Sequence, residues 1–411
     1  MPEDFQDSAW RSVRLGDVCF INPDKIDTEW PHEKIEYIDI SSVGTGVITT
    51  SPSQIPVSDA PSRAQRLVRP GDTILATVRP NLRSFAYLAE TKPNTVVSTG
   101  FAVLRSTEES DRRFIYYVVS DQSFTDYLAA RAEGSAYPAV SVAVIGDAEL
   151  RLPPIEEQRS IGEVLGALDD KIEQNRRTAR ALERLARAIF RAWFVDFEPV
   201  KAKAAGGTSF PSMRQEVFDA LPTRFVDSDI GSVPEGWEVS AFGELLELAY
   251  GKALKAGDRK SGSIPVYGSN GRVGWNEEAL EPQPGIIVGR KGNPGTVEWS
   301  STAFFPIDTT FFVRLKDDRT SLPLLYYQLV SADLKRLATD SAVPGINRNM
   351  IYAESCVIPN TDVRTAFDGL ANACWELAAS LDNESRMLAD VRDYLLPRLL
   401  SGQVRVQVPN G

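Results

Sequence analysis

The stretch IGEVLGALDDKIEQNRRTARALERLARAIFRAW, residues 161–193, decides the fold. Its mostly apolar seam positions follow one another in alternating steps of four and three residues, a heptad pattern that predicts a coiled-coil helix. They are Ile161, Leu165, Leu168, Ile172, Asn175, Ala179, Leu182, Ala186, Ile189 and Trp193. A helix over residues 156–197 would be about 60 Å long at ~1.5 Å per residue, so its apolar stripe needs a partner over most of that length.

A second heptad run near the C-terminus supplies that partner. Its predicted seam is Phe367, Leu370, Cys374, Leu377, Leu381, Glu384, Leu388, Val391 and Leu395. A globular stretch separates the two runs and the chain is internally duplicated, so we expect an antiparallel pair with a pseudo-twofold axis. Asn175 and Glu384 each interrupt a seam near its middle. A polar residue there costs stability but fixes register, and we expect these two side chains to meet.

The first helix also carries a row of arginines, again at steps of three and four residues. These are Arg176, Arg180, Arg184, Arg187 and Arg191. Two interpretations stay open: the row faces phosphates or an acidic partner, or it is the solvated flank of a coiled coil.

Outside the helices, the chain repeats itself in divergent form. Tyr116-Tyr117 and Tyr326-Tyr327 sit in matching contexts, as do Ser135-Ala-x-Pro138 and Ser341-Ala-x-Pro344. Each copy then runs through an apolar strand into a proline and a long helix. Trp10 matches Trp237 at a shift of 227 residues, whereas Pro138 matches Pro344 at a shift of 206, so the first globule holds about twenty more loop residues. Divergent loops on a common frame indicate two binding specificities.

The predicted fold class is α+β, with two mixed, mostly β domains separated by two long antiparallel coiled-coil helices. The expected boundaries are a first recognition domain over 1–153, a long helix over 154–198, a linker over 199–236, a second recognition domain over 237–359, and a second long helix with a tail over 360–411. Helices are expected at Arg113–Ala130 and Leu322–Leu337 beside the tyrosine pairs, and a short one at Met213–Leu221 in the linker.

Composition narrows the class of protein. The chain has 411 residues, 43% hydrophobic and 25% charged, which is ordinary for a globular protein of two or three domains. Its longest apolar runs fall well short of the ~20 residues of a membrane span, and residues 1–4 do not begin a signal peptide. Three separated cysteines predict neither a disulfide framework nor a thiolate metal site. We expect a cytoplasmic protein.

The net charge of −11 argues against binding DNA by bulk attraction. It constrains non-specific attraction more than local recognition, however. Residues 252–295 hold seven Lys or Arg against four acids, so a local grip on DNA is compatible with the acidic total.

Loops that join glycine, asparagine and basic residues are the candidate DNA contacts. Arginine can pair bidentately with guanine, asparagine with adenine, and lysine can hold phosphate. Pro70-Gly71 matches Pro284-Gly285, so residues 77–83 occupy the place of residues 289–295. The structural alternative is a set of tight hairpins with solvated charges, and for the loops before the exit strands a plain turn. The candidates are Arg79, Asn81, Arg83, Tyr137, Lys252, Arg259, Lys260, Asn270, Arg272, Arg290, Lys291, Asn293, Asn347 and Arg348.

Catalytic motifs are missing from the sequence. His32 is the only histidine, and no phosphate-binding loop or adenine-methylase motif occurs. Asp169-Asp170-Lys171 matches part of a nuclease signature only superficially, since it lies on the predicted coiled coil without a further acid in reach. We therefore predict a non-catalytic chain without a metal site.

Four stretches, in order, resemble the specificity subunit of type I restriction–modification enzymes. They are residues 152–158 (LPPIEEQ), 188–199 (AIFRAWFVDFEP), 227–237 (DSDIGSVPEGW) and 391–402 (VRDYLLPRLLSG). Residues 359–364 (PNTDVR) depart from the Pro-Pro-x-x-Glu-Gln form of the first helix entry, which puts equal docking surfaces in doubt.

The resemblance implies two target-recognition domains that read the halves of an asymmetric bipartite DNA site, with the long helices as a ruler for the spacer. It implies docking of two methyltransferase subunits, which bind S-adenosylmethionine, and of two ATP- and Mg-dependent restriction/translocase subunits; no cofactor is expected in this chain. The helix residues expected to build the coiled coil and dock partners are Leu165, Leu168, Ile172, Asn175, Leu182, Ile189, Trp193, Phe194, Leu377, Leu381, Glu384, Leu388, Val391 and Leu395.

Three alternatives stay open at this level. The chain could be the targeting subunit of a related restriction system whose partner carries both methylase and nuclease. It could be a stand-alone, repressor-like DNA binder, which would bind tightly without partners. It could be a pure scaffold, which would leave the paired basic loops without a role.

Overall fold

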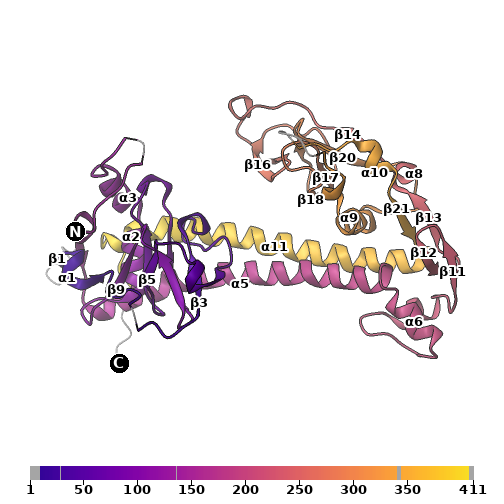
Figure 1. Ribbon diagram of the computed structural model, residues 1–411. Coiled ribbons are helices and arrows are strands. Elements are labelled where there is room, and N and C mark those ends of the chain that lie inside the picture. The colour runs from indigo at the N-terminus through magenta and orange to yellow at the C-terminus, as the bar shows by residue number, and fades with distance from the viewer. Residues whose placement is uncertain (1–9, 28, 136, 340–343, 407–411) are drawn as a thin grey trace. The chain divides into compact units, whose positions relative to one another are not determined.

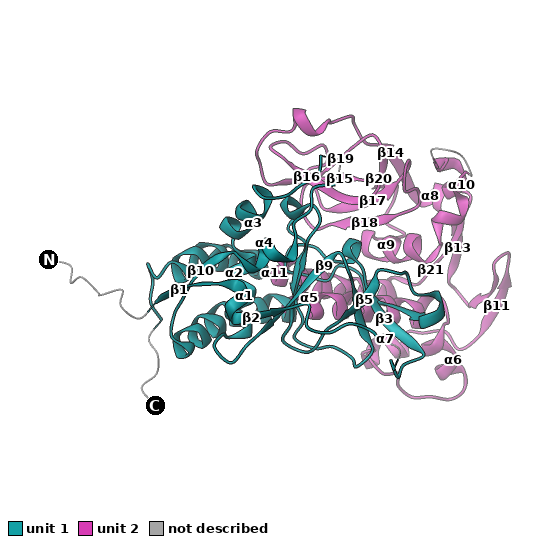
Figure 2. Ribbon diagram, turned by 60° about the vertical axis from the view of Figure 1, so that its left-hand side comes forward, with its two compact units in different colours: residues 1–174, 384–411 teal, residues 175–383 magenta. Residues whose placement is uncertain are grey.

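The computed structural model describes residues 10–27, 29–135, 137–339 and 344–406 (Figure 1). The chain divides into two compact units, residues 1–174 with 384–411 and residues 175–383 (Figure 2). The two long helices are α5 (Ile155–Phe194) and α11 (Thr361–Leu400), each of 40 residues. Part of each helix belongs to each unit, so each unit is built on two helical segments.

Unit 1 carries two four-stranded sheets, ordered β2-β9-β6-β7 and β4-β3-β8-β5, and the pair β1-β10. Asp111 caps α2 by accepting hydrogen bonds from the backbone N–H groups of Arg113 and Phe114. The elements are β1 (Arg11–Arg14), α1 (Leu15–Val18), β2 (Cys19–Ile21), β3 (Lys34–Ile38), η1 (Ile40–Ser42), β4 (Ser53–Pro56), η2 (Val57–Asp59), β5 (Ala64–Leu67), β6 (Thr73–Ala76), η3 (Pro80–Leu82), β7 (Phe85–Tyr87), β8 (Thr95–Ser98), β9 (Phe101–Ser106), α2 (Arg112–Ser120), α3 (Gln122–Ala129), α4 (Val142–Gly146) and β10 (Glu149–Leu152).

Unit 2 carries a four-stranded sheet, β14-β20-β17-β18, a three-stranded sheet, β16-β15-β19, and the pairs β11-β12 and β13-β21. Its elements are α6 (Glu198–Ala204), α7 (Gln215–Asp219), β11 (Phe225–Ser228), β12 (Gly231–Pro234), β13 (Glu238–Ala241), α8 (Phe242–Leu245), β14 (Leu246–Tyr250), η4 (Ala256–Asp258), β15 (Ile264–Gly268), β16 (Gly271–Asn276), β17 (Gly285–Gly289), β18 (Val297–Ser300), β19 (Phe305–Pro306), β20 (Thr310–Leu315), α9 (Leu322–Ser331), η5 (Leu334–Leu337), α10 (Arg348–Tyr352) and β21 (Ser355–Ile358).

The strand orders show the duplication directly. The order β2-β9-β6-β7 of unit 1 corresponds to β14-β20-β17-β18 of unit 2, and β1-β10 corresponds to β13-β21. Each second sheet contains one parallel pair, β3 with β8 and β15 with β19. Strand β5 is the extra member in unit 1, and it accounts for part of the additional loop length. The predicted α+β class and internal repeat are confirmed.

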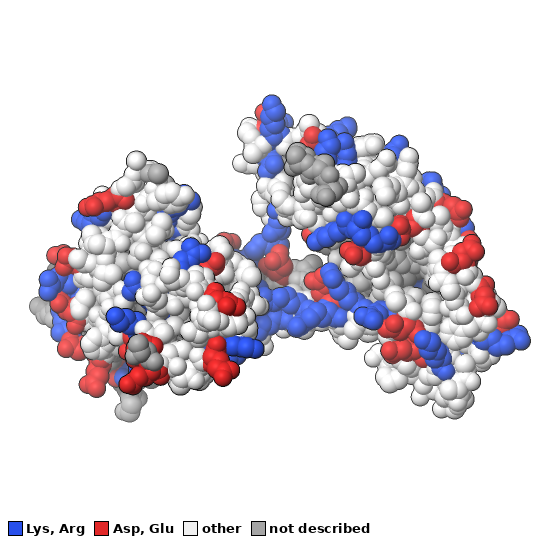
Figure 3. All heavy atoms as spheres, viewed as in Figure 1, with Lys and Arg blue, Asp and Glu red and all other residues white. Residues whose placement is uncertain are grey.

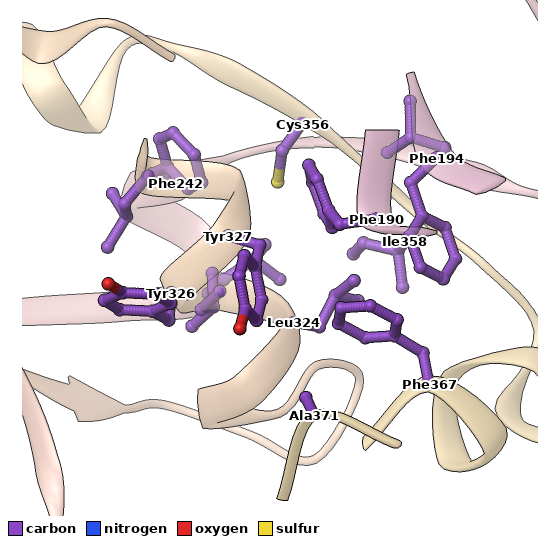
Figure 4. Packing of buried hydrophobic residues seen from close by; sticks show 14 of the residues in the cluster. Phe190, Phe194, Phe242, Leu324, Tyr326, Tyr327, Cys356, Ile358, Phe367 and Ala371 are labelled. Atoms are coloured by element: carbon purple, nitrogen blue, oxygen red, sulfur yellow. The ribbon is translucent and has the colours of Figure 1, made fainter. Parts of the chain in front are cut away.

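Aromatic side chains from α5, α9 and α11 fill the core of unit 2 (Figure 4). Phe190 lies 5.8 Å from both Tyr327 and Phe367 between ring centroids, and Phe194 lies 5.2 Å from Phe367. The described α5 and α11 segments of this unit are therefore held together and to the recognition domain by one apolar cluster.

The predicted seam of α5 is confirmed, because all ten of its positions are buried or half-buried. The predicted seam of α11 is partly wrong. Leu377 and Val391 are each 47% exposed, whereas Ala371 and Ser385, which the prediction left out, are buried. The prediction selected large apolar residues and left out the buried alanine and serine, because alanine and serine contribute little to an apolar pattern.

Asn175 and Glu384 have different environments. Asn175 is 1% exposed and lies in unit 2, as its seam position predicts. The Glu384 side chain is 45% exposed in unit 1, and its carboxylate lies 3.7 Å from the Lys171 ammonium. Glu384 is half-buried and pairs with Lys171, and its meeting with Asn175 to fix the register stays a prediction.

Two predicted helices are each divided by an aspartate. Residues 113–130 form α2 and α3, separated at Asp121, whose side chain accepts a hydrogen bond from the Ser123 N–H. Residues 322–337 form α9 and η5, separated near Asp333, which has a positive φ of 46°. The linker holds α6 as well as α7, the shorter counterpart of the predicted helix over 213–221. The repeated residues Ala136 and Ser341-Ala342 lie outside the described residues.

Candidate nucleic-acid interface

In unit 2, the loop after β17 and the loop before α10 are joined by backbone hydrogen bonds. The Gly292 N–H donates to the Pro344 carbonyl at 3.0 Å, and the Ile346 N–H donates to the Arg290 carbonyl at 3.0 Å. Gly295 has φ +77°, and a Cβ there would lie 2.6 Å from the Leu334 carbonyl carbon, so this close turn requires glycine. The two loops, predicted separately, form one surface.

Two arginines from these loops converge on Tyr250, at the end of β14. The Arg290 guanidinium lies 4.9 Å and the Arg348 guanidinium 5.2 Å from the centre of the Tyr250 ring. Arg290 also donates to the Asp308 carbonyl at 3.1 Å. Tyr250 is 49% exposed and its ring lies 5.1 Å from Phe311. The arrangement holds two guanidinium groups beside an aromatic ring, and a guanidinium group can bind phosphate or a base edge.

The other predicted DNA contacts of unit 2 fall into two groups: some side chains are exposed, and others make hydrogen bonds or ion pairs within the unit. Lys252, Lys291, Asn270 and Arg272 are exposed, and the Arg272 guanidinium lies 4.7 Å from the Trp275 ring. Arg259 donates to the Val273 carbonyl at 2.6 Å, and Lys260 pairs with Glu277 at 3.5 Å. Asn347 caps α10 by accepting from the Asn349 N–H, and Asn293 is half-buried. Arg259 and Asn347 thus hold the loops in shape.

In unit 1, the corresponding loops meet in the same way. The Arg79 N–H donates to the Pro138 carbonyl at 2.6 Å, and the Val140 N–H donates to the Thr77 carbonyl at 2.9 Å. The Arg79 guanidinium lies 4.7 Å from the Tyr137 ring, which is 69% exposed. An arginine beside an exposed aromatic ring is therefore a feature of both units.

Arg83 and Asn81 of unit 1 are placed differently. The Arg83 guanidinium donates to the Gln122 side chain at 2.5 Å and the Ser120 carbonyl at 2.6 Å. It ties the loop to α2 and α3, and it serves the fold. Asn81 lies exposed in η3, beside Leu82, which is 60% exposed.

Sequence reasoning missed Tyr250, Trp275 and Leu82. Each is a large side chain at least 39% exposed next to a predicted basic residue. The signal was present in the sequence, since each lies within three residues of a candidate arginine, lysine or asparagine. It could have been found by looking for aromatic and apolar residues at loop tips.

Burial shifts the pKa values of groups below these loops. Burial raises the pKa of Tyr267 in β15 and of Glu298 in β18. Among the described residues, no cluster of three or more His, Cys, Asp or Glu could hold a metal ion. Over the same residues, no helix is both long and apolar enough to cross a membrane.

Comparison with known proteins agrees with this architecture. Residues 7–184 match the family described as type I restriction modification DNA specificity domain. The chain is 23% identical over 471 aligned positions to the type I restriction enzyme HindI specificity subunit of Haemophilus influenzae, covering 97% of this chain and 100% of that protein. It is 24% identical to the MjaIX specificity subunit of Methanocaldococcus jannaschii, covering 82% of this chain and 79% of that protein.

This chain is similar over nearly its whole length to a type I restriction enzyme specificity subunit. The fold agrees as well: the S subunit of a type I restriction–modification system from M. genitalium superposes with a TM-score of 0.59 at 16% identity, covering 96% of this chain and 97% of that one. The resemblance predicted from four short stretches is confirmed over nearly the whole length.

Proposed function

We propose that this chain is the DNA-reading subunit of a type I restriction–modification complex. Its two recognition domains each bind one half of an asymmetric bipartite site, and it positions methyltransferase and restriction subunits on that DNA. The observation that supports this most is the repeated loop pair, held by equivalent backbone hydrogen bonds in both domains yet carrying different exposed side chains. A shared frame with different contact residues suits two different half-sites.

Within this proposal, the arginine–aromatic groups make the first contacts. Arg79 with Tyr137 serves one half-site, and Arg290 with Arg348 beside Tyr250 serves the other. Arg79 is exposed, whereas Arg290 and Arg348 are half-buried. In this proposal their guanidinium groups contact base edges, while the exposed Lys252 and Lys291 neutralise phosphates.

Partner docking is proposed on the outer face of α11. Met387, Val391 and Tyr394 are 62%, 47% and 60% exposed and follow one another by steps of four and three, which places them on one face. Exposed apolar side chains in a row are typical of interaction surfaces. Two methyltransferase subunits carrying S-adenosylmethionine are the proposed partners, with two restriction/translocase subunits that use ATP and Mg in the complete complex.

A binding series with and without the methyltransferase tests the proposal. The methylated sequence is first mapped in the source genome, and duplexes carrying it are titrated with this chain alone and with the assembled complex. We expect specific binding to sharpen when methyltransferase is added. Equal, tight binding by the chain alone would support a stand-alone binder, and no sequence preference in either case would support a scaffold.

A matched pair of variants tests the docking face within the same series. Val391→Asp should weaken assembly with the methyltransferase by placing a charge in an apolar contact. Val226→Asp, at a 42% exposed valine in the linker region, is the control and should leave assembly intact. If both variants assemble normally, the face on α11 is not the docking surface.

A further inference from the structure

Helix α5 changes charge abruptly near its middle. Residues 155–174 contain six Asp or Glu and two Lys or Arg, whereas residues 175–194 contain six Arg and one Glu. The chain as a whole carries −11, so the second segment is a local concentration of positive charge. Figure 3 shows Lys and Arg side chains gathered along the α5 segment of unit 2. Arg176, Arg180, Arg184 and Arg187 are called the basic stripe below.

The coiled-coil frame does not require this charge. The two long helices begin at Ile155 and Thr361 and end at Phe194 and Leu400, so each α5 position plus 206 gives its counterpart in α11. The counterparts of the basic stripe are Asp382, Arg386, Asp390 and Asp393. An equally long helix with an equivalent seam thus carries three acids at the same four places, and the stripe has a function specific to unit 2.

The basic stripe adjoins the recognition domain of its own unit. Arg187 pairs with Glu183 at 2.6 Å and interacts with the charge of Glu298 on β18. A Cβ on Gly271, the first residue of β16, would lie 3.5 Å from a Glu298 carboxylate oxygen. Arg272 is the next residue. The stripe therefore approaches the β15–β16 hairpin, whose tip carries the exposed Asn270 and Arg272.

Two arginines of the basic stripe can bind an external anion without giving up a contact within the protein. Arg176 and Arg184 are both exposed, and among the described residues neither guanidinium takes part in an ion pair or hydrogen bond. Exposed arginines without a carboxylate neighbour can neutralise an external anion at little cost in desolvation.

We infer that the basic stripe binds the phosphate backbone of duplex DNA next to the half-site contacted by the second recognition domain. This inference rests on the proposed function. From Arg176 to Arg187 the helix rises about 16 Å, which matches about five phosphates of one strand at ~3.4 Å each. Continuity with the hairpin favours DNA over an acidic protein partner, because a duplex held by that hairpin extends past its end. Three of the four counterparts in α11 are acidic, so we expect no equivalent phosphate contact on that helix.

The salt dependence of binding tests the inference. The double variant Arg176→Gln/Arg184→Gln is assembled with methyltransferase, and its affinity for the cognate duplex is measured from 50 to 200 mM salt. Each lost phosphate contact lowers the log–log slope by ~0.9, so two contacts reduce the salt-induced loss of affinity by about 12-fold over this range. Methylation should remain at the same sequence, since phosphate contacts carry no base information.

A matched control removes the same charge elsewhere in unit 2. Lys201→Gln/Arg214→Gln changes two exposed basic residues outside the basic stripe, and its salt slope should equal that of the unmodified complex. An unchanged slope in the Arg176/Arg184 variant would overturn the inference. So would a loss of methyltransferase assembly measured without DNA, because the stripe would then bind a protein. If the unmodified complex shows no sequence-specific binding, the proposed function fails instead.

Discussion

The two units pack against their helical segments through different kinds of interaction. In unit 1 the Tyr117 hydroxyl donates to Asp169 of α5 at 2.7 Å, and Arg392 of α11 donates to the same carboxylate at 2.6 Å. In unit 2 the counterpart of Asp169 is Trp375, whose ring lies 4.2 Å from Trp299 and 5.8 Å from Tyr327. We call the group Tyr117, Asp169 and Arg392 of unit 1 the charged seat. We call the stacked rings Trp375, Trp299 and Tyr327 of unit 2 the aromatic seat.

A second pair of positions repeats this contrast. The Trp10 indole donates to Glu157 at 3.0 Å in unit 1. The matching Trp237 of unit 2 lies in the apolar core, and the counterpart of Glu157 is the fully buried Val363. Duplication has thus preserved where the domain contacts the helices while the contact itself changed from polar to apolar. The two units therefore share the positions of these contacts but not their chemistry.

The largest expected effect breaks the aromatic seat. Trp375→Ala should lower the free energy of unfolding by about 3 kcal/mol, since it removes a large ring that stacks on two others. Chemical denaturation followed by tryptophan fluorescence measures this. Tyr394→Ala, at a 60% exposed tyrosine on the same helix, should change stability by no more than about 0.5 kcal/mol. A loss below 1 kcal/mol for Trp375→Ala would show that the stack is not what holds this domain.

The charged seat should respond in a different way to its own disruption. Arg392→Met leaves a partly buried Asp169 with a single donor, and we expect a loss of about 2 kcal/mol, less than for a fully buried pair because both side chains are about a quarter exposed. Adding Asp169→Leu should recover much of this loss, because an apolar pair can replace an ion pair of similar volume. A double variant that is as unstable as the sum of two single losses would contradict this.

The same substitution at the two matched tyrosines sharpens the comparison further. Tyr117→Phe removes a hydrogen bond to a carboxylate and should cost about 1.5 kcal/mol. The buried Tyr327 hydroxyl makes no well-formed hydrogen bond among the described residues and interacts weakly with the Trp375 side chain, so Tyr327→Phe should change stability less than Tyr117→Phe. Paired denaturation curves measure both. Equal effects at the two sites would remove the distinction between the seats.

The smallest expected effect concerns Glu298. Burial, and secondarily the charge of Glu183, raises the pKa of Glu298 above its ordinary value of 4.5. The folded state then binds the proton more tightly than the unfolded state, so ionised Glu298 lowers stability at neutral pH, and that penalty fades as the pH falls through the raised pKa toward 4.5. Glu298→Gln should stabilise the protein at pH 7, with the gain shrinking below the raised pKa. A constant gain at all pH values would contradict the assignment.

The sequence predicted the two long helices and the internal repeat better than the roles of individual loop side chains. The α5 seam was correct because large apolar residues occupy seven of its ten positions. The α11 seam was partly wrong because small residues such as Ala371 and Ser385 occupy it, although shifting the α5 seam by 206 residues would have placed them correctly. Internal duplication was thus a stronger guide to register than apolar periodicity in the second helix.

Side-chain roles in the loops were less predictable. The pairing of loops 77–83 with 137–140 and of 289–295 with 344–348 agrees with their matched order in the chain. Whether an arginine points outward or into the fold depends on acceptors that sequence spacing does not reveal. Arg83 meets the carbonyl that ends α2, and Arg259 meets the carbonyl of Val273, so both are engaged by the backbone.

The most direct measurement compares half-site preferences of two sets of variants in the assembled methyltransferase complex. Arg79→Ala alters the first recognition domain, and Arg290→Ala/Arg348→Ala alters the second. Each complex is titrated with duplexes in which one half-site or the other is scrambled. We predict that each variant loses discrimination at one half-site and keeps it at the other, and that the two variants affect opposite halves. Loss of discrimination at the same half-site by both would contradict the account that two separate domains read the two halves.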